Sequence, residues 1–398
     1  MKPRRLATLV ALVLPAFLYG LYRFSLGVLV PGLESVYAVS DATAGGIVSA
    51  SVGLVGLGVI ASGYLAQRFG DLKTILAGFL LFSASMAVIS VSAGLLSFSA
   101  PFLIAAFGSG LMITPSYGVA AALFPERRGF AASFVTSFYS FAGFLGPSSA
   151  GFLLASYGWD APFAAFAAVG LVFFLVFVAV LGTGLRSSST SALGTFGDLL
   201  RKRVIVVLAV AAFFADFGFL VYLSWTPKFL ITSFSSSGAS TTTIDSFFGI
   251  GLGLGGVGTL VGGALFDRIG GRKSASLAAI LPAIAMLGVY LANSYEVAIF
   301  FVLLTGILAN MFWSLLTAMC QVNVPEERRT AATSLVQTSG FVGAFLGPGI
   351  AGVAGGPVSS VLILTSAVPY LLLMVVVVFF YRDPIRAVLP KALSGSGG

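Results

Sequence analysis

The sequence lacks histidine altogether and contains a single cysteine, Cys320, in 398 residues. No imidazole can therefore relay a proton or bind a metal, and no internal disulfide can form. Charged residues are also scarce, at 9% of the chain, whereas soluble domains carry about 25%. A chain so poor in charge cannot cover a soluble surface of this size, so lipid must be the solvent for most of it.

Signatures of catalysis are missing as well. The chain has no phosphate-binding loop of the G-x-x-x-x-G-K-[ST] type, so nothing indicates ATP hydrolysis. No nucleophile stands beside a base, and no cluster has metal-ligand spacing, so we expect no enzyme, no catalytic residues, no metal and no cofactor. The net charge of +8 could suit nucleic acid, but the basic residues form short clusters between apolar runs. We therefore expect no nucleic-acid partner.

What the chain does contain is an internal repeat at a spacing of 200 residues. The string GYLAQRFGDLK at 63–73 returns as GALFDRIGGRK at 263–273. The string FAGFLGP at 141–147 returns, with one extra residue, as FVGAFLGP at 341–348. A whole-half repeat in a very apolar chain predicts two similar membrane bundles related by an axis along the membrane normal. Such an architecture suits a transporter whose substrate lies between the halves.

Apolar runs of about 17–25 residues or more are long enough to span a bilayer. The first run belongs to the repeat pattern, so it predicts a spanning helix and not a signal peptide. The expected fold is an all-α membrane protein with twelve transmembrane helices in two pseudo-symmetric six-helix bundles. The expected spans are 6–31, 42–66, 73–95, 98–124, 130–156 and 160–184, then 203–231, 243–266, 274–292, 296–322, 330–354 and 358–381.

The distribution of lysine and arginine predicts the orientation. Of the 21 basic residues, all but Arg23 and Lys228 fall in loops or termini on one side. We therefore expect a multi-pass protein of the inner or plasma membrane, with both termini in the cytoplasm, and a monomer. The expected domains are an N-terminal bundle at 1–184, a cytoplasmic central loop at 185–202, a C-terminal bundle at 203–382 and a cytoplasmic tail at 383–398.

The two six-span halves, each with this loop motif after its second span, resemble the major facilitator superfamily of secondary transporters. The copy at 263–273 matches the motif of that family well. The first copy departs from it, since Gln67 replaces the expected aspartate and Asp71 replaces a basic residue. In the family this loop helps to lock the cytoplasmic side between the halves.

Both copies of the loop lie at the predicted cytoplasmic side. From the residues alone, Gly63 and Gly263 are expected to allow close helix packing near that side, with Arg68 and Arg268 at the level of the headgroups. The resemblance implies a gating role for Arg68, Asp267 and Arg268. The alternative is that the loop serves only topology and packing.

Two charges lie well inside predicted spans, although each costs about 2.5–3.5 kcal/mol on insertion scales. They are Arg23 in the first span and Asp216 in the seventh. Arginine is a planar, permanently charged donor, so we predict that Arg23 binds an anionic substrate. We predict that Asp216, near the midplane, carries a coupling proton. The alternatives are a structural Arg–Asp pair across the halves, or Arg23 reaching the outer headgroups.

Further candidates for substrate binding are uncharged polar or aromatic side chains inside spans. Some lie close to Arg23 in the sequence, some lie in polar stripes along one helix face, and Tyr117 is a further aromatic hydroxyl inside a span. They are Tyr19 and Tyr22 in the first span, Tyr117 in the fourth, Asn310 and Trp313 in the tenth and Gln337 in the eleventh. Lys228, beside Trp225 and Pro227, is expected to anchor the seventh helix at the outer interface.

These observations favour a secondary active transporter that moves a small, carboxylate-like organic anion by alternating access, coupled to protons. The string YLSWTPKFL at 222–230 is similar to the end of the seventh span in organic anion/cation symporters of the superfamily. One alternative is a proton-coupled efflux antiporter for lipophilic or drug-like compounds, favoured by 37 phenylalanines and by the glycine-proline string at 143–151. Another is a membrane sensor on a transporter scaffold, which would usually need an added cytoplasmic domain.

Overall fold

The computed structural model describes residues 3–123, 128–181, 196–235, 238–325 and 328–382, and in these ranges the regular structure is entirely helical. Ten of the described helices are long and apolar enough to cross a membrane. Two more, α5 and α12, are 30 and 26 residues long but rich in glycine, serine and threonine. Together they account for the twelve predicted spans. Most of the predicted central loop and the predicted tail lie outside the described residues.

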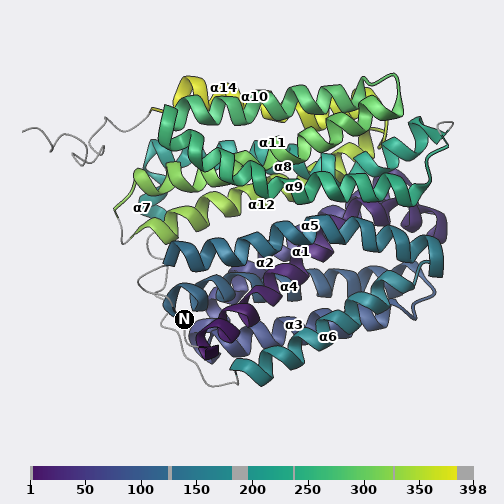
Figure 1. The fold of residues 1–398 in the computed structure, drawn as a ribbon, viewed down its shortest axis with the longest axis horizontal. Helices are drawn as coiled ribbons and strands as arrows, with labels where there is room; N and C mark the ends of the chain where they lie inside the picture. The colour runs from purple at the N-terminus through teal and green to yellow at the C-terminus, as the bar shows by residue number, and fades with distance from the viewer. Residues whose placement is uncertain (1–2, 124–127, 182–195, 236–237, 326–327, 383–398) are drawn as a thin grey trace, which may run out of the picture.

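The helices form two groups along the chain. Figure 1 shows α1–α6 and α8–α14 as two stacked layers, and α1 begins at the same end of the molecule at which α14 ends. We call this end the terminal end and the opposite one the far end. The first group comprises α1 (Pro3–Tyr37), α2 (Asp41–Phe69), α3 (Asp71–Ile89), α4 (Leu95–Leu123), α5 (Arg128–Tyr157) and α6 (Ala161–Leu181). The second follows the short α7 (Phe196–Leu200) and comprises α8 (Arg203–Ser233), α9 (Thr241–Ile269), α10 (Gly271–Tyr290), α11 (Tyr295–Val322), α12 (Arg329–Ala354), α13 (Ser359–Leu362), η5 (Ile363–Ala367) and α14 (Val368–Phe380).

The sequence repeat reappears in the helix caps. Ser40 and Ser240 begin α2 and α9, and each side chain accepts a hydrogen bond from the backbone N–H three residues on, at 3.3 and 3.1 Å. At the other ends of these helices, Gly70 and Gly270 have positive φ values of 95° and 84°. Glycine adopts this conformation without strain, so one residue suffices to turn the chain into the next helix.

The same repeat shapes the interface between the two bundles, where α2 packs against α12 and α9 packs against α5. A Cβ added at Gly53 would lie 2.6 Å from the ring of Phe345, and one added at Gly253 would lie 2.5 Å from Cβ of Phe144. In each pair, a phenylalanine of one bundle therefore packs directly against a glycine of the other. The two interfaces are pseudo-symmetric copies of one packing arrangement.

Toward the terminal end the bundles separate. A Cβ at Gly56 or Gly256 still meets a side chain of the other bundle, at 3.3 and 3.6 Å. A Cβ at Gly63 or Gly263, two turns further along, meets nothing within 4 Å. The expectation of close packing at Gly63 and Gly263 is therefore wrong for this structure, because α2 and α9 diverge from the opposite bundle before reaching these residues.

Candidate functional site

The two charges predicted inside the membrane meet between the bundles. Arg23 on α1 is 8% exposed and Asp216 on α8 is 3% exposed. Arg23 Nη2 lies 3.5 Å from Asp216 Oδ1. Charge-assisted hydrogen bonds of this kind are usually about 2.7–2.9 Å long. The pair is therefore buried and in contact, yet loosely joined.

Arg23 uses little of its donor capacity. Its Nη1 donates to the hydroxyl of Tyr19 at 2.6 Å, one helical turn away. Its Nε is buried without a hydrogen-bond partner. The rings of Tyr19 and Phe341 each lie with their centroid 5.9 Å from the guanidinium carbon. A guanidinium has five N–H donors, so Arg23 can still bind an anion while the aromatic rings hold its charge in place.

Asp216 lies where α12 leaves room for it. A Cβ added at Gly340 would stand 2.6 Å from Asp216 Oδ2 and 3.1 Å from the ring of Trp313. The absence of a side chain at Gly340 thus lets the carboxylate of α8 and the indole of α11 approach the same point on α12. Trp313, predicted to bind substrate, is brought to the charged pair.

Tyr139 on α5 belongs to this site, although the sequence analysis did not single it out. Its ring stacks on that of Tyr19, with centroids 5.5 Å apart and an interplanar angle of 20°. The predicted fifth span has a polar stripe along one helix face, formed by Ser133, Thr136, Ser137 and Ser140. Tyr139 follows Thr136 by three residues, so it lies on the same face. That spacing could have identified it. Tyr117, another predicted residue, interacts with the Thr136 side chain from α4.

Tyr22 and Asn310 lie elsewhere. The ring of Tyr22 packs inside the first bundle, 5.8 Å from Phe82 and 5.4 Å from Phe102. Asn310 Nδ2 donates to a backbone oxygen of its own helix, Gly306 O, at 2.9 Å. A Cβ added at Gly255 on α9 would collide with the Asn310 amide, so this side chain faces α9 and not Asp216. The roles of Tyr22 and Asn310 in substrate binding stay predictions.

The remaining predicted residues lie toward the terminal end. Gln337 is exposed on α12, one turn before Phe341. Arg68 Nη1 donates to the hydroxyl of Tyr64 at 3.4 Å, within its own helix. Asp267 and Arg268 form no ion pair with any residue that the structure describes. The gating roles of Arg68, Asp267 and Arg268 stay predictions, since in this arrangement the bundles are apart where these side chains lie.

A second ionic cluster joins the bundles at the far end. Lys228 on α8 forms ion pairs with Glu34 on α1 and Asp41 on α2. Its Nζ also lies 5.6 Å from the ring centroid of Trp225. Lys228, expected to anchor its helix at the outer interface, instead links the two bundles, because the two carboxylates of the opposite bundle hold its ammonium between them.

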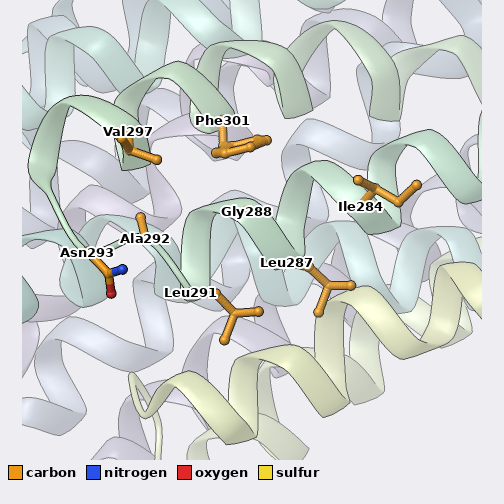
Figure 2. A pocket seen from close by; sticks show the side chains of 8 residues that line it. All are labelled: Ile284, Leu287, Gly288, Leu291, Ala292, Asn293, Val297 and Phe301. Carbon is orange, nitrogen blue, oxygen red and sulfur yellow. The ribbon is translucent and has the colours of Figure 1, made fainter.

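A groove on the periphery of the second bundle contains none of the candidate site residues. It has a volume of about 420 Å³ and runs between α10 and α11. Figure 2 shows its lining, which is apolar apart from Asn293 and includes Phe301 and the bare backbone of Gly288. Its chemistry differs from that of the charged pair, so we do not assign it to the same site.

An all-helical membrane protein whose two bundles enclose a buried Arg–Asp pair has the architecture of a secondary transporter. Comparison with known families agrees. The sequence profile described as Major Facilitator Superfamily matches residues 12–295 and 229–396. The chain belongs to the major facilitator superfamily, as its repeat and loop motifs predicted.

Individual relatives are more distant. The chain is 28% identical over 262 residues to Protein TsgA of Shigella dysenteriae, covering 63% of this chain and 58% of the relative. It is 31% identical over 172 residues to Protein TsgA of Salmonella paratyphi B, covering 41% of this chain and 40% of the relative. The aligned region thus spans about half the length of these relatives.

Solved structures agree in fold over nearly the whole chain. A bacterial homolog of the human lysosomal transporter Spinster, in an inward-facing and unoccupied conformation, has a TM-score of 0.76 at 18% identity, covering 96% of this chain and 95% of that one. A D-xylose-proton symporter has a TM-score of 0.75 at 19% identity, covering 95% and 98%. At these identities the likeness shows the fold alone.

Proposed function

We propose that this protein is a secondary active transporter of a small, carboxylate-like organic anion, coupled to protons. The observation that carries the proposal is the buried pair of Arg23 and Asp216 between the bundles. A permanent cation with unused donors supports binding of an anion from outside the protein. A carboxylate beside it supports proton coupling in a chain that has no histidine. The D-xylose-proton symporter of similar fold is a precedent for proton coupling.

The two groups compete, and this competition supplies the coupling. Without substrate, Arg23 is the neighbouring positive charge that favours the ionised form of Asp216. When a substrate carboxylate engages the Nε and Nη2 atoms of Arg23, it takes the place of Asp216 as the counter-charge. Asp216 is then left without a counter-charge, and its burial disfavours the ionised form of its carboxylate. Asp216 accepts a proton, and substrate and proton move together.

Access to the site alternates between the two ends. The basic loops at the terminal end favour a cytoplasmic location for it, in the inner or plasma membrane. The bundles touch at the far end and separate beyond Gly56 and Gly256. With the terminal end in the cytoplasm, this arrangement supports an inward-facing state. The similar Spinster homolog is also inward-facing. We expect a monomer to complete the cycle, since the substrate site is formed within one chain.

The test begins with the purified protein. Small carboxylates should raise its thermal unfolding temperature, whereas neutral sugars and cationic dyes should not. In liposomes, Asp216→Asn should then exchange a stabilising carboxylate across the membrane but fail to concentrate it when only a pH difference is applied. Asp160→Asn removes an exposed carboxylate at the far end and serves as the matched control.

The contrary outcomes are equally specific. Stabilisation by cationic dyes alone would favour the efflux antiporter, and stabilisation by sugars alone would exclude an anionic substrate. If Asp216→Asn still concentrates substrate under a pH difference, Asp216 is not the proton carrier. The Arg23–Asp216 contact would then be structural.

A further inference from the structure

A third buried carboxylate stands outside the site described above. Asp245 lies on α9, near the far end, and is 1% exposed. Its Oδ1 is buried without a hydrogen-bond partner. A Cβ added at Gly151 on α5 would lie 2.8 Å from Cβ of Asp245, so this carboxyl is pressed against the backbone of the other bundle. It is part of the surface that closes the far end.

The pseudo-symmetric copy of this contact contains no carboxyl. Gly45 is the counterpart of Asp245 at the 200-residue spacing, and it faces Gly352 on α12, whose Cα would lie 3.3 Å from an added Cβ. Gly352 is in turn the counterpart of Gly151, allowing for the one-residue shift in the repeat. The ring of Trp225 lies 3.0 Å from a Cβ added at either of these two glycines, so an aromatic ring fills the space in this copy of the contact. Such an interface therefore closes without a carboxyl.

The surroundings of Asp245 offer no counter-charge. In the part of the chain that the structure describes, none of the titratable side chains at this end forms an ion pair or hydrogen bond with it. Lys228 is engaged by Glu34 and Asp41. The titratable groups at this end on helices that contact α9 are Tyr157 on α5, Tyr295 and Glu296 on α11, Tyr290 on α10, Tyr222 and Lys228 on α8, and Glu34 and Tyr37 on α1.

We propose that Asp245 is a second proton-binding site, which links closure of the far end to the uptake of one proton from the solution on that side. A carboxylate that is buried without a partner is strongly disfavoured in its ionised form. The closed interface therefore holds the neutral carboxyl. When α5 and α9 separate, water reaches Asp245 and the proton leaves to the far-side solution. This inference rests on the alternating access proposed above, but not on Asp216 as carrier.

The sign of the pH response follows from this balance. The closed far end contains one more proton than the open one, so a rise in pH favours the open form. For a single site, the ratio of open to closed molecules rises by at most about tenfold per pH unit. Acid on the far side would then hold the far end shut and alkali would release it.

The test measures the far end directly. Spin labels at Ser156→Cys on α5 and Thr241→Cys on α9, both exposed positions, report the separation of the two helices in a Cys320→Ala background. In the otherwise native protein the long-distance population should grow as the pH is raised from about 5 to about 9. Asp245→Asn should stay at the short distance throughout. Asp245→Gly places at this position the residue found at its counterpart, Gly45, and should also stay at the short distance. This second variant keeps the test decisive if Asp245→Asn does not fold.

Two controls separate this proposal from the proposed function. Asp160→Asn, which removes an exposed carboxyl at the same end, should keep the native pH response. Asp216→Asn should keep it too, even if that variant has lost accumulation of substrate. A pH response that persists in Asp245→Asn and Asp245→Gly, or that is absent from the native protein, overturns the role of Asp245. Loss of the response in Asp216→Asn alone would assign it to the central carboxylate instead.

Discussion

At the residue scale, the loosely joined Arg23–Asp216 pair distinguishes this molecule from an inert helical bundle. A buried ion pair contributes little net stability, because desolvation of both charges offsets their attraction. A separation of 3.5 Å and an unpartnered Nε mean that the pair is not optimised as a structural link. Such a pair is better suited to exchanging partners than to holding two bundles together.

Arg23→Lys is the sharpest test of the anion site. Lysine keeps the charge but has no planar fork, so it cannot present two parallel donors to a carboxylate. Losing one charge-assisted hydrogen bond costs about 1.5–3 kcal/mol, which corresponds to a Kd about 10- to 150-fold higher. Calorimetric titration with a stabilising carboxylate would measure it. The control is Arg203→Lys, at an exposed arginine where α8 begins, which should bind the carboxylate as tightly as the native protein does. If Arg23→Lys binds the carboxylate as tightly as this control, Arg23 is not part of the anion site.

At the element scale, glycines decide how closely the helices approach. A Cβ added at Gly258 on α9 would collide with the backbone oxygen of Ile307 on α11, and one at Gly58 on α2 would collide with that of Phe107 on α4. The two contacts are again counterparts in the repeat. Each lies within a bundle, and each fixes a helix that also forms the interface between bundles.

Gly258→Val should therefore destabilise the folded protein. The added side chain has no room against Ile307, and overpacking of this kind costs about 1–3 kcal/mol. Thermal unfolding in detergent should show a clearly lower midpoint than for the native protein. Gly263→Val is the matched control on the same helix, because nothing lies within 4 Å of that position. A midpoint for Gly258→Val no lower than that of the control would mean that α9 and α11 can move apart without cost.

The sequence predicted the elements better than it predicted their ends and partners. Hydropathy and the repeat gave the twelve spans, but α1 continues from the expected end at 31 to Tyr37. Hydropathy detects only the apolar part of a helix. The extra turns of α1 place Glu34 in contact with Lys228, and this contact depends on the other bundle. The burial of Asp245 depends on the approach of α5 at Gly151, a contact that hydropathy does not predict. Comparing Asp245 with Gly45 in the repeat was the one available signal.

At the scale of the whole molecule, the two ends of the interface differ in what holds them. The far end has the ionic cluster around Lys228, the hydrogen bond from Gly349 N–H on α12 to Ser49 Oγ on α2 at 2.7 Å, and the glycine contacts of α2 and α9. At the terminal end, the described parts of the two bundles share no ion pair. Alternating access requires the opposite arrangement at another stage of the cycle, with new contacts at the terminal end.

Gly63 is the place where that other arrangement can be tested. It lies seven residues, or about two helical turns, after Gly56 and on the same face of α2. Because nothing lies within 4 Å of it here, Gly63→Leu should leave this arrangement, in which the terminal end is open, and its thermal stability unchanged. When the terminal end closes, however, α2 must approach the other bundle as closely as it does at Gly53 and Gly56, where a leucine would not fit.

Gly63→Leu should therefore hold the terminal end open and slow transport, while Gly63→Ala should have an intermediate effect. Spin labels at Gln67→Cys on α2 and Arg329→Cys on α12, in the Cys320→Ala background, would report the opening of this end, and uptake into liposomes would report the rate. Gly46→Leu is the control, since Gly46 also has open space around it but lies at the far end of the same helix. Transport at the native rate in Gly63→Leu, with a short label distance still populated, would mean that the terminal end closes without α2 approaching the second bundle at Gly63. The gate would then have to be formed by other helices.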